Sequence, residues 1–203
     1  MKTGISRYGV SKVTVTGHSL GQFQRSVWSR CSLLSLLIDP FSGAAISLLD
    51  AVYLPLQIPS ISIRAVLYGL PRVFSFTHRL LKTPLITLIQ VGNQAFADYI
   101  DAHVTSLTRI NNKKDPIAIV PGRSLGFHHP SGEVHINSSS AWVACAGKQF
   151  AVRQYVYRLL TEHRRLPGQD NTNSQCEVGA VPNILVSNII DHLGPYDGVW
   201  MGC

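Results

Sequence analysis

The segment Thr16-Gly17-His18-Ser19-Leu20-Gly21 constrains this chain more than any other, because it directly follows the β-branched run Val13-Thr14-Val15. A Gly-x-Ser-x-Gly pattern after a strand is typical of a nucleophile elbow, a sharp strand-to-helix turn that lifts a serine hydroxyl clear of the backbone. A side chain in place of either glycine would collide with the neighbouring strand or helix. The sequence therefore predicts that Ser19 follows a strand and precedes a helix.

The same turn predicts part of the machinery for acyl transfer. Ser19 is the expected nucleophile, and the backbone N–H of the next residue, Leu20, is the expected donor of an oxyanion hole. One preorganised donor of this kind lowers a reaction barrier by roughly 3 kcal/mol. The five-letter pattern also occurs in ordinary serine-containing turns, so it is the preceding strand that favours the elbow.

Composition indicates a single globular domain over residues 1–203, since 45% of the residues are hydrophobic and 14% are charged. Asp39 and Asp50 interrupt the most apolar region, so we expect no transmembrane segment. The first residues, Met1 to Arg7, lack the apolar stretch of a secretory signal peptide. Four cysteines without a Cys-x-x-Cys pair suggest neither a disulfide scaffold nor a zinc site.

Hydrophobic patterning predicts alternating strands and helices after the elbow. Strands are expected at Ser11 to Thr16, Ser62 to Tyr68 and Leu107 to Asn111. Helices are expected at Ala44 to Tyr53 and at Asn93 to His103, with Asn93 as the N-cap. The predicted fold class is therefore α/β, with a mostly parallel sheet, helices on both faces and the active residues at the carboxyl edges of the strands.

Several blocks of sequence, read in order from the elbow, resemble the fungal class 3 lipases, which are secreted α/β-hydrolases that act on triacylglycerols and related esters. The blocks are Gly9 to Gly21, Ala44 to Asp50, Tyr68 to Val73, Val91 to Ile100, Thr108 to Pro116, Gly126 to Val134 and Asp191 to Leu193. The resemblance covers only the C-terminal part of such a lipase. It implies a partial α/β-hydrolase fold that lacks the N-terminal strands, the lid and the loop with the second oxyanion donor.

Three segments, 22–43, 74–90 and 148–168, interrupt these blocks. They carry nine of the 18 Lys and Arg residues but two of the 11 acidic residues, so the rest of the chain is neutral despite the net charge of +7. We therefore expect no nucleic-acid partner. We interpret the segments as translated introns, because the first break falls inside the helix after the elbow. Surface-loop insertions are the alternative, since the free-energy cost of loop closure grows slowly with loop length.

The chain contains serine, aspartate and histidine in the order of the α/β-hydrolase triad. Ser19, Asp115 and His192 match the three motifs of the resembled family. The resemblance implies that His192 accepts the proton of the Ser19 hydroxyl and that Asp115 orients the imidazole and stabilises the imidazolium. Four further histidines are expected to be surface or structural groups: His103, His128, His129 and His135.

The resemblance also implies roles for cysteines and turn residues. Cys145 and Cys176 match a local disulfide of some secreted relatives, whereas Cys203 matches a cysteine whose partner lies in the missing part, which predicts a free thiol. His18 is expected to support the elbow. A strand-to-helix corner of architectural residues is expected from Gly69, Pro71, Arg72, Gly92 and Asn93.

The sequence leaves three functions open. The first is a serine ester hydrolase of the triacylglycerol lipase type, which forms an acyl-enzyme on Ser19, needs no metal or organic cofactor and meets lipid esters at a lipid–water interface. By resemblance this enzyme is secreted. The second is an inactive, truncated lipase homologue whose triad does not assemble, and the third and weakest is a basic membrane-surface or nucleic-acid binder.

Overall fold

The computed structural model describes residues 9, 11–19, 43–72, 75–76, 88–89, 92–145 and 169–201. The interrupting segments 22–43, 74–90 and 148–168 fall almost entirely outside the described residues, as do Leu20 and Cys203. The interpretation of these segments as insertions in a single domain therefore stays a prediction.

The central element is a five-stranded, mostly parallel sheet, which confirms the predicted fold class. β1, β2, β5 and β6 run parallel to one another, and β7 pairs with β6 in the antiparallel direction. In spatial order the strands are β1 (Lys12–His18), β2 (Ser62–Tyr68), β5 (Leu107–Asn112), β6 (Glu133–Ile136) and β7 (Trp142–Ala144). A separate antiparallel pair is formed by β3 (Ser75–Phe76) and β4 (Leu88–Ile89).

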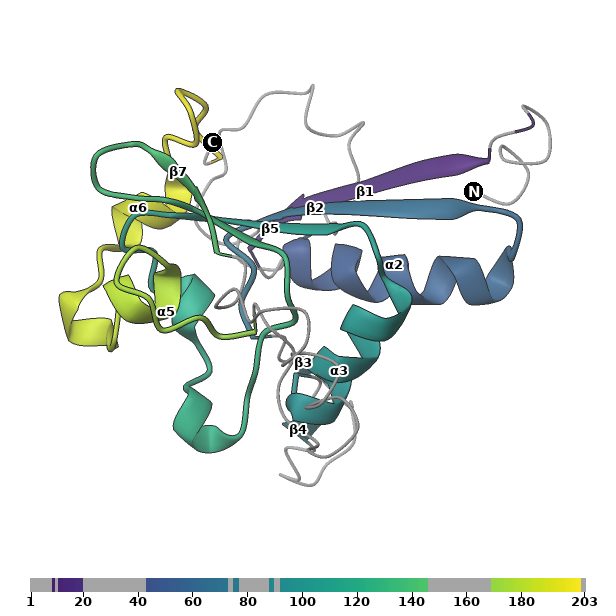
Figure 1. Cartoon of the computed structure of the whole chain (residues 1–203), viewed down its shortest axis with the longest axis horizontal. Helices are drawn as coiled ribbons and strands as arrows, with labels where there is room; N and C mark the ends of the chain where they lie inside the picture. The colour runs from purple at the N-terminus through teal and green to yellow at the C-terminus, as the bar shows by residue number, and fades with distance from the viewer. Residues whose placement is uncertain are drawn as a thin grey trace, which may run out of the picture.

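Two helices cover one face of the sheet, α2 (Ala44–Gln57) and α3 (Gln94–His103). Leu48 of α2 and Ile100 of α3 belong to the same buried cluster as Leu67 of β2, so both helices pack on the face to which Leu67 points. Figure 1 shows both helices below the sheet. Since α2 extends past Pro55, it is longer than predicted; proline is tolerated there because only the last turn loses a hydrogen bond.

The opposite face of the sheet is covered by the end of the chain. Because side chains alternate along a strand, Val66 and Tyr68 of β2 point away from α2 and contact a second cluster that contains Ile110 and Tyr196. This C-terminal segment follows α6 (Ile189–Leu193) and returns to it through a hydrogen bond from the Met201 N–H to the Leu193 carbonyl (2.7 Å).

The carboxyl ends of the parallel strands meet at one edge of the sheet, on the left in Figure 1, where α5 (Glu177–Ala180) and α6 lie. Three short 3-10 helices complete the described chain: η3 (Ile117–Ile119), η4 (Arg123–Leu125) and η5 (Ile184–Val186). None of the helices in the described ranges has both the length and the apolar character needed to cross a membrane.

Candidate active site

Ser19 lies in a strained turn at the end of β1. Its φ angle is 60°, in the left-handed region that residues other than glycine seldom adopt. The turn is held from both sides, because the Ser19 N–H donates to the Tyr68 carbonyl (3.0 Å) and the Ser19 carbonyl accepts from the Ala45 N–H (3.2 Å). These two hydrogen bonds tie the serine to the neighbouring strand β2 and to the helix α2, which is the backbone geometry that a nucleophile elbow requires.

Asp115 and His192 form a buried pair although 77 positions separate them in the chain. Nδ1 of His192 lies 2.8 Å from Oδ2 of Asp115, and the side chains are 7% and 0% exposed. The second carboxylate oxygen, Oδ1, accepts the Ile117 N–H at 2.7 Å. Since a carboxylate only accepts hydrogen bonds, Nδ1 of His192 carries a hydrogen, so Nε2 is the ring nitrogen that can serve as the base.

The helix that carries His192 is fastened to the turn that carries Asp115. The Asn112 side chain donates to the Asp191 carbonyl (2.8 Å), and the Lys114 N–H donates to the Asp191 carboxylate (3.2 Å). The Asn188 N–H donates in turn to the Lys114 carbonyl (2.8 Å). These contacts fix α6 relative to the end of β5 and so hold the imidazole against the carboxylate.

Gly69, at the end of β2, leaves room for the same pair. A Cβ atom at this position would lie 2.7 Å from Cε1 of His192 and 2.9 Å from Oδ2 of Asp115, and the glycine has a φ angle of 53°. Its N–H donates to the Ile110 carbonyl of β5 (2.9 Å). Gly69 is therefore required by both the turn and the close approach of the Asp115–His192 pair.

His18, which precedes Ser19, stacks on the ring of His192 with 4.4 Å between the ring centroids. Its Nε2–H donates to the His192 carbonyl (2.7 Å), which also accepts the hydroxyl of Tyr196 (3.2 Å). Burial and the neighbouring His192 together lower the pKa of His18 to about 4. At neutral pH His18 is thus an uncharged ring stacked on His192.

Three of the predicted site residues, Ser19, Asp115 and His192, lie at the carboxyl edge of the sheet. Asp115 and His192 are in direct contact, and the ring of His18, which precedes Ser19 in the chain, stacks on the ring of His192. The hydrogen bond from the Ser19 hydroxyl to Nε2 of His192 stays a prediction, as does the oxyanion donor at Leu20, which lies outside the described residues.

A second buried cluster joins two loops near this edge. Asp170 accepts hydrogen bonds from Nε of Arg72 (3.0 Å) and from Nδ1 of His128 (2.8 Å). Arg72 also donates to the carbonyls of Ile119 and Pro121. Burial lowers the pKa of Arg72, and the carboxylate of Asp170 opposes this effect. These contacts give Arg72 a structural role, as expected for the strand-to-helix corner.

Among the described residues, one group of side chains brings metal-ligand atoms close together: Glu133, Cys145 and Cys176. The two cysteines, however, form a disulfide with 5.8 Å between their Cα atoms, as predicted. Because the thiolate is the form of cysteine that binds metal, the oxidised pair offers no ligand to a cation.

Sequence reasoning missed several residues of the site. Gly69 was expected only as a turn residue, although its position after a parallel strand would have placed it at the active edge. Asn112 and Asp191 lie in blocks that carry the family resemblance, but no role was predicted for them, because their contact joins segments far apart in the chain. Of the four histidines expected to be surface or structural groups, His128, His129 and His135 are buried.

Comparisons of the sequence with curated proteins find secreted lipases of yeasts of the genus Malassezia. A secreted mono- and diacylglycerol lipase of Malassezia globosa is 28% identical over 86% of this chain and 46% of its own length. A second such lipase of the same species is 28% identical over 88% of this chain and 47% of its own length. The chain spans about half the length of the curated relatives it matches. No model of a protein family matches the chain.

Comparisons of the structure find fungal lipases of the same fold. Lipase II from Rhizopus niveus superposes with a TM-score of 0.60 and 23% identity, over 99% of this chain and 52% of that protein. The triacylglyceride lipase of Rhizomucor miehei gives a TM-score of 0.59 and 22% identity, over 98% of this chain and 52% of that protein. A third match is a triacylglycerol lipase described as having a serine protease triad as its catalytic centre. It gives a TM-score of 0.58 and 23% identity, over 99% of this chain and 53% of that protein.

Proposed function

Because the chain resembles part of the fungal class 3 lipases, we propose that it is a serine carboxylic ester hydrolase with Ser19, Asp115 and His192 as its catalytic triad. The observation that carries the proposal is the buried hydrogen bond of 2.8 Å between His192 and Asp115. This pair lies at the same sheet edge as the strained elbow of Ser19. A serine on a strained turn beside an imidazole oriented by a carboxylate is the arrangement that acyl transfer needs.

In the proposed reaction, the Ser19 hydroxyl attacks the ester carbonyl while Nε2 of His192 takes its proton. Asp115 stabilises the imidazolium that forms. When the tetrahedral intermediate collapses, the carbon–oxygen bond to the alcohol breaks and His192 gives its proton to the departing alkoxide. Water, deprotonated by His192, then attacks the acyl-enzyme, and the carboxylic acid leaves as the proton returns to Ser19.

The negative oxygen of the tetrahedral intermediate needs a hydrogen-bond donor, and we assign this role to the backbone N–H of Leu20. It follows the nucleophile directly, which is where an elbow supplies one donor. Such a donor contributes roughly 3 kcal/mol to the lowering of the barrier. The reaction uses no metal or organic cofactor.

The proposed substrates are acylglycerol esters at a lipid–water interface. Two of the sequence relatives are named as mono- and diacylglycerol lipases and a structural relative as a triacylglyceride lipase. The names of the sequence relatives also contain the word secreted, so we propose that the protein acts outside the cell.

Hydrolysis of p-nitrophenyl butyrate by the purified chain tests the proposal. We expect Ser19→Ala and His192→Gln each to lower kcat on the order of 10⁴-fold or more, because the triad acts as a unit. Ser139→Ala serves as the matched control, since Ser139 is exposed in a turn after β6. Equal rates for the wild type and Ser19→Ala would refute the assignment.

The alternative function is an inactive homologue, in which the triad residues persist but the Ser19 hydroxyl is not activated. The chain spans about half the length of the curated relatives it matches, so the activity of those relatives is itself a proposal for this chain. A fluorophosphonate, which labels only an activated serine, separates the two functions. Labelling of Ser19 supports the esterase, whereas a cooperatively folded chain that does not react supports the inactive homologue.

A further inference from the structure

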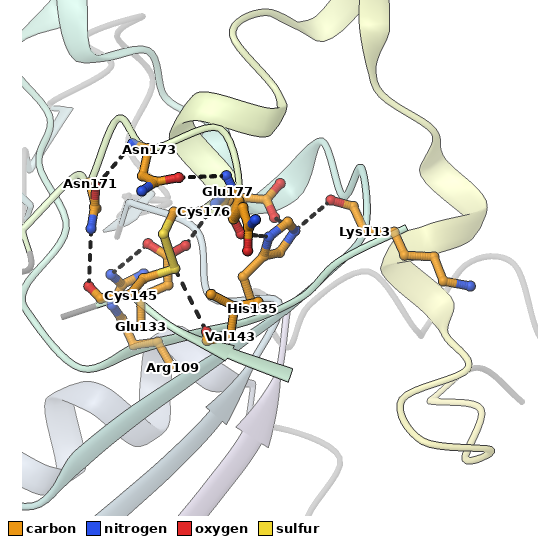
Figure 2. The surroundings of a disulfide bond; sticks show 11 residues. Arg109, Lys113, Glu133, His135, Val143, Cys145, Asn171, Asn173, Cys176 and Glu177 are labelled. Atoms are coloured by element: carbon orange, nitrogen blue, oxygen red, sulfur yellow. Dashed lines mark hydrogen bonds and ion pairs between the residues drawn. A yellow bond between two sulfur atoms is a disulfide. The ribbon is translucent and has the colours of Figure 1, made fainter. Parts of the chain in front are cut away.

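His135 is a buried histidine that the proposed reaction does not use. It lies on β6, and its two ring nitrogens face two backbone carbonyls from different parts of the chain. Nε2 is 2.8 Å from the Lys113 oxygen, and Nδ1 is 2.6 Å from the Gln175 oxygen. Figure 2 shows the Lys113 carbonyl turned toward the ring and the Lys113 side chain pointing away from it.

These contacts determine the protonation state of the His135 ring. A carbonyl oxygen only accepts hydrogen bonds, so each ring nitrogen must carry a hydrogen. A ring with both hydrogens is an imidazolium cation. A neutral ring would leave one buried carbonyl facing a lone pair, which costs the free energy of an unmade hydrogen bond.

Glu177 supplies the counter-charge for this cation. Its carboxylate lies 3.2 Å from Nε2 of His135, and both side chains are buried. Burial alone would lower the pKa of His135, but the hydrogen bond and negative charge of Glu177, together with the two carbonyls, raise it to about 9. Burial also raises the pKa of Glu177 to about 8, against the attraction of His135. The geometry favours the charged pair, because only a doubly protonated ring satisfies both the Lys113 and the Gln175 carbonyl. The other charged groups around the pair are Glu133, which is itself paired with Arg109 at 3.5 Å, and Asp115.

On one side, His135 holds the turn that carries the catalytic carboxylate. Lys113 has a φ angle of 47°, in the left-handed region, and its N–H donates to the Ile136 carbonyl (2.7 Å). Two residues later, the Asp115 N–H donates to the Asn112 carbonyl (3.1 Å) and closes the turn. Anchoring the Lys113 carbonyl therefore anchors the backbone from which the Asp115 side chain reaches His192.

On the other side, His135 contacts the segment fixed by the disulfide. Gln175 and Glu177 flank Cys176, which is bonded to Cys145 beside the end of β7. The Glu177 N–H also donates to the Glu133 carboxylate (2.7 Å). The ring thus joins a covalently fixed segment to the turn before Asp115.

We propose that His135 is a positioning residue for the Asp115–His192 pair and that it acts as an imidazolium, clamping the Lys113 carbonyl to the disulfide-linked segment at Gln175 and Glu177. This inference rests on the proposed function for its catalytic consequence. The clamp itself follows from the contacts of His135 alone.

Kinetics of two variants test the clamp. His135→Phe keeps the ring volume but removes both donors, and we expect kcat to fall on the order of 10- to 100-fold with KM little changed, because a small displacement of Asp115 lowers the rate without touching the substrate. Glu177→Gln keeps the shape but removes the counter-charge. In this variant the loss of activity at alkaline pH should begin about one pH unit or more below that of the wild type.

A control and a second readout keep the test decisive. His103→Gln, at an exposed histidine whose Nδ1 donates to the Tyr99 carbonyl of the same helix, should leave both kcat and the pH profile unchanged. Ring ¹⁵N NMR of the wild type should show His135 doubly protonated at pH 7, whereas His129, a buried histidine with one carbonyl acceptor, should be neutral.

The outcomes separate this inference from the proposed function. A neutral His135 at pH 7, a folded His135→Phe with wild-type kcat or an unchanged alkaline limb in Glu177→Gln would each overturn the clamp. If the wild type has no esterase activity, the proposed function fails, and ring ¹⁵N NMR still tests the clamp. In that case the ring signals of His192 should shift at the pH at which His135 titrates, and that pH should be lower in Glu177→Gln.

Discussion

A methyl group at Gly69 would lie within 3 Å of both members of the Asp115–His192 pair. The pair is thus confined by the backbone of β2 as well as by its own hydrogen bond. At the scale of single residues, the site depends on the absence of a side chain at Gly69 as much as on attractive contacts. Ser19 has the complementary feature, a left-handed backbone that places its side chain at the end of the strand.

The first prediction concerns this confinement. Gly69→Ala should lower kcat on the order of 100-fold, because the new methyl group displaces the imidazole and the carboxylate from their bonded geometry. Gly126→Ala is the matched control, since Gly126 also has a positive φ angle, of 83°, but no heavy atom within 4 Å of the position that a Cβ atom would take. Both variants are assayed on a soluble ester at equal folded fraction. Similar losses of kcat in both would show that the effect comes from backbone strain alone.

His18 gives a prediction about pH. Because its pKa falls from 6.5 to about 4 on folding, its contribution to stability is fully present above pH 6.5 and is lost as the pH falls toward 4. Between pH 7 and pH 5 this loss amounts to about 2 kcal/mol. His18→Phe should remove that share of the acid sensitivity while keeping the stacked ring. Urea unfolding at both pH values measures the free energy of unfolding. An equal change in this free energy with pH in the wild type and in His18→Phe would contradict the prediction.

At the scale of elements, the start of α2 shows how the elbow connects to its helix. In a helix an N–H donates to the carbonyl four residues earlier. The Ala45 N–H donates to the Ser19 carbonyl, and Ala45 would be the fourth residue after Ser19 if Gly21 were joined directly to Ala44. Gly43, which precedes Ala44 in the chain, is the same residue type as Gly21. The helix therefore lies where a chain without residues 22–43 would place it.

Deletion of residues 22–43 should accordingly leave the fold intact. We expect the Tm of the shortened chain to be no more than about 3 °C below that of the full chain, which corresponds to about 1 kcal/mol for a protein of this size. Deletion of residues 22–44 is the control, because one further residue rotates the buried face of α2 by about 100°. Calorimetry compares the three proteins. Equal destabilisation by both deletions would show that the register of α2 does not depend on this junction.

At the scale of the whole molecule, the segment before His192 exposes an unusual run of apolar side chains. Leu185 is 91% exposed, and Ile189 and Ile190 on α6 are more than half exposed. Exposed apolar side chains close in the chain to His192, the proposed catalytic histidine, suit contact with a lipid surface. Under the proposed function, this segment is the part of the described chain that meets the substrate interface.

Leu185→Asp tests this contact. Loss of one buried leucine from a lipid surface should lower the rate on an emulsified long-chain ester about tenfold, while the rate on a soluble short-chain ester stays unchanged. Leu125→Asp is the control, because Leu125 is also an exposed leucine, at 68%, but lies on η4 away from α6 in the chain. If both variants lose the same activity on the emulsion, general surface polarity and not this segment is responsible.

The sequence by itself determined three of the parallel strands, β1, β2 and β5, and the two longest described helices, α2 and α3, whereas β6, β7, α5 and α6 were not predicted. Alternating apolar residues predicted β2 at the bounds that the structure has, and an asparagine predicted the N-cap of α3, where the Asn93 side chain accepts the Phe96 N–H. The Gly-x-Ser-x-Gly pattern predicted a sharp turn at Ser19, where the structure has a left-handed backbone. Such features could be predicted because backbone propensities, caps and turns depend on residues close together in the chain.

Only the tertiary structure decided which side chains meet. The contact between Asp115 and His192, the space left by Gly69 and the charged clamp of His135 all join strands or loops that are far apart in the chain. Parallel pairing brings the ends of β1, β2 and β5 to one edge, and burial there determines which groups keep a charge. The distances and the low-dielectric environment that set these interactions arise only after the sheet has formed.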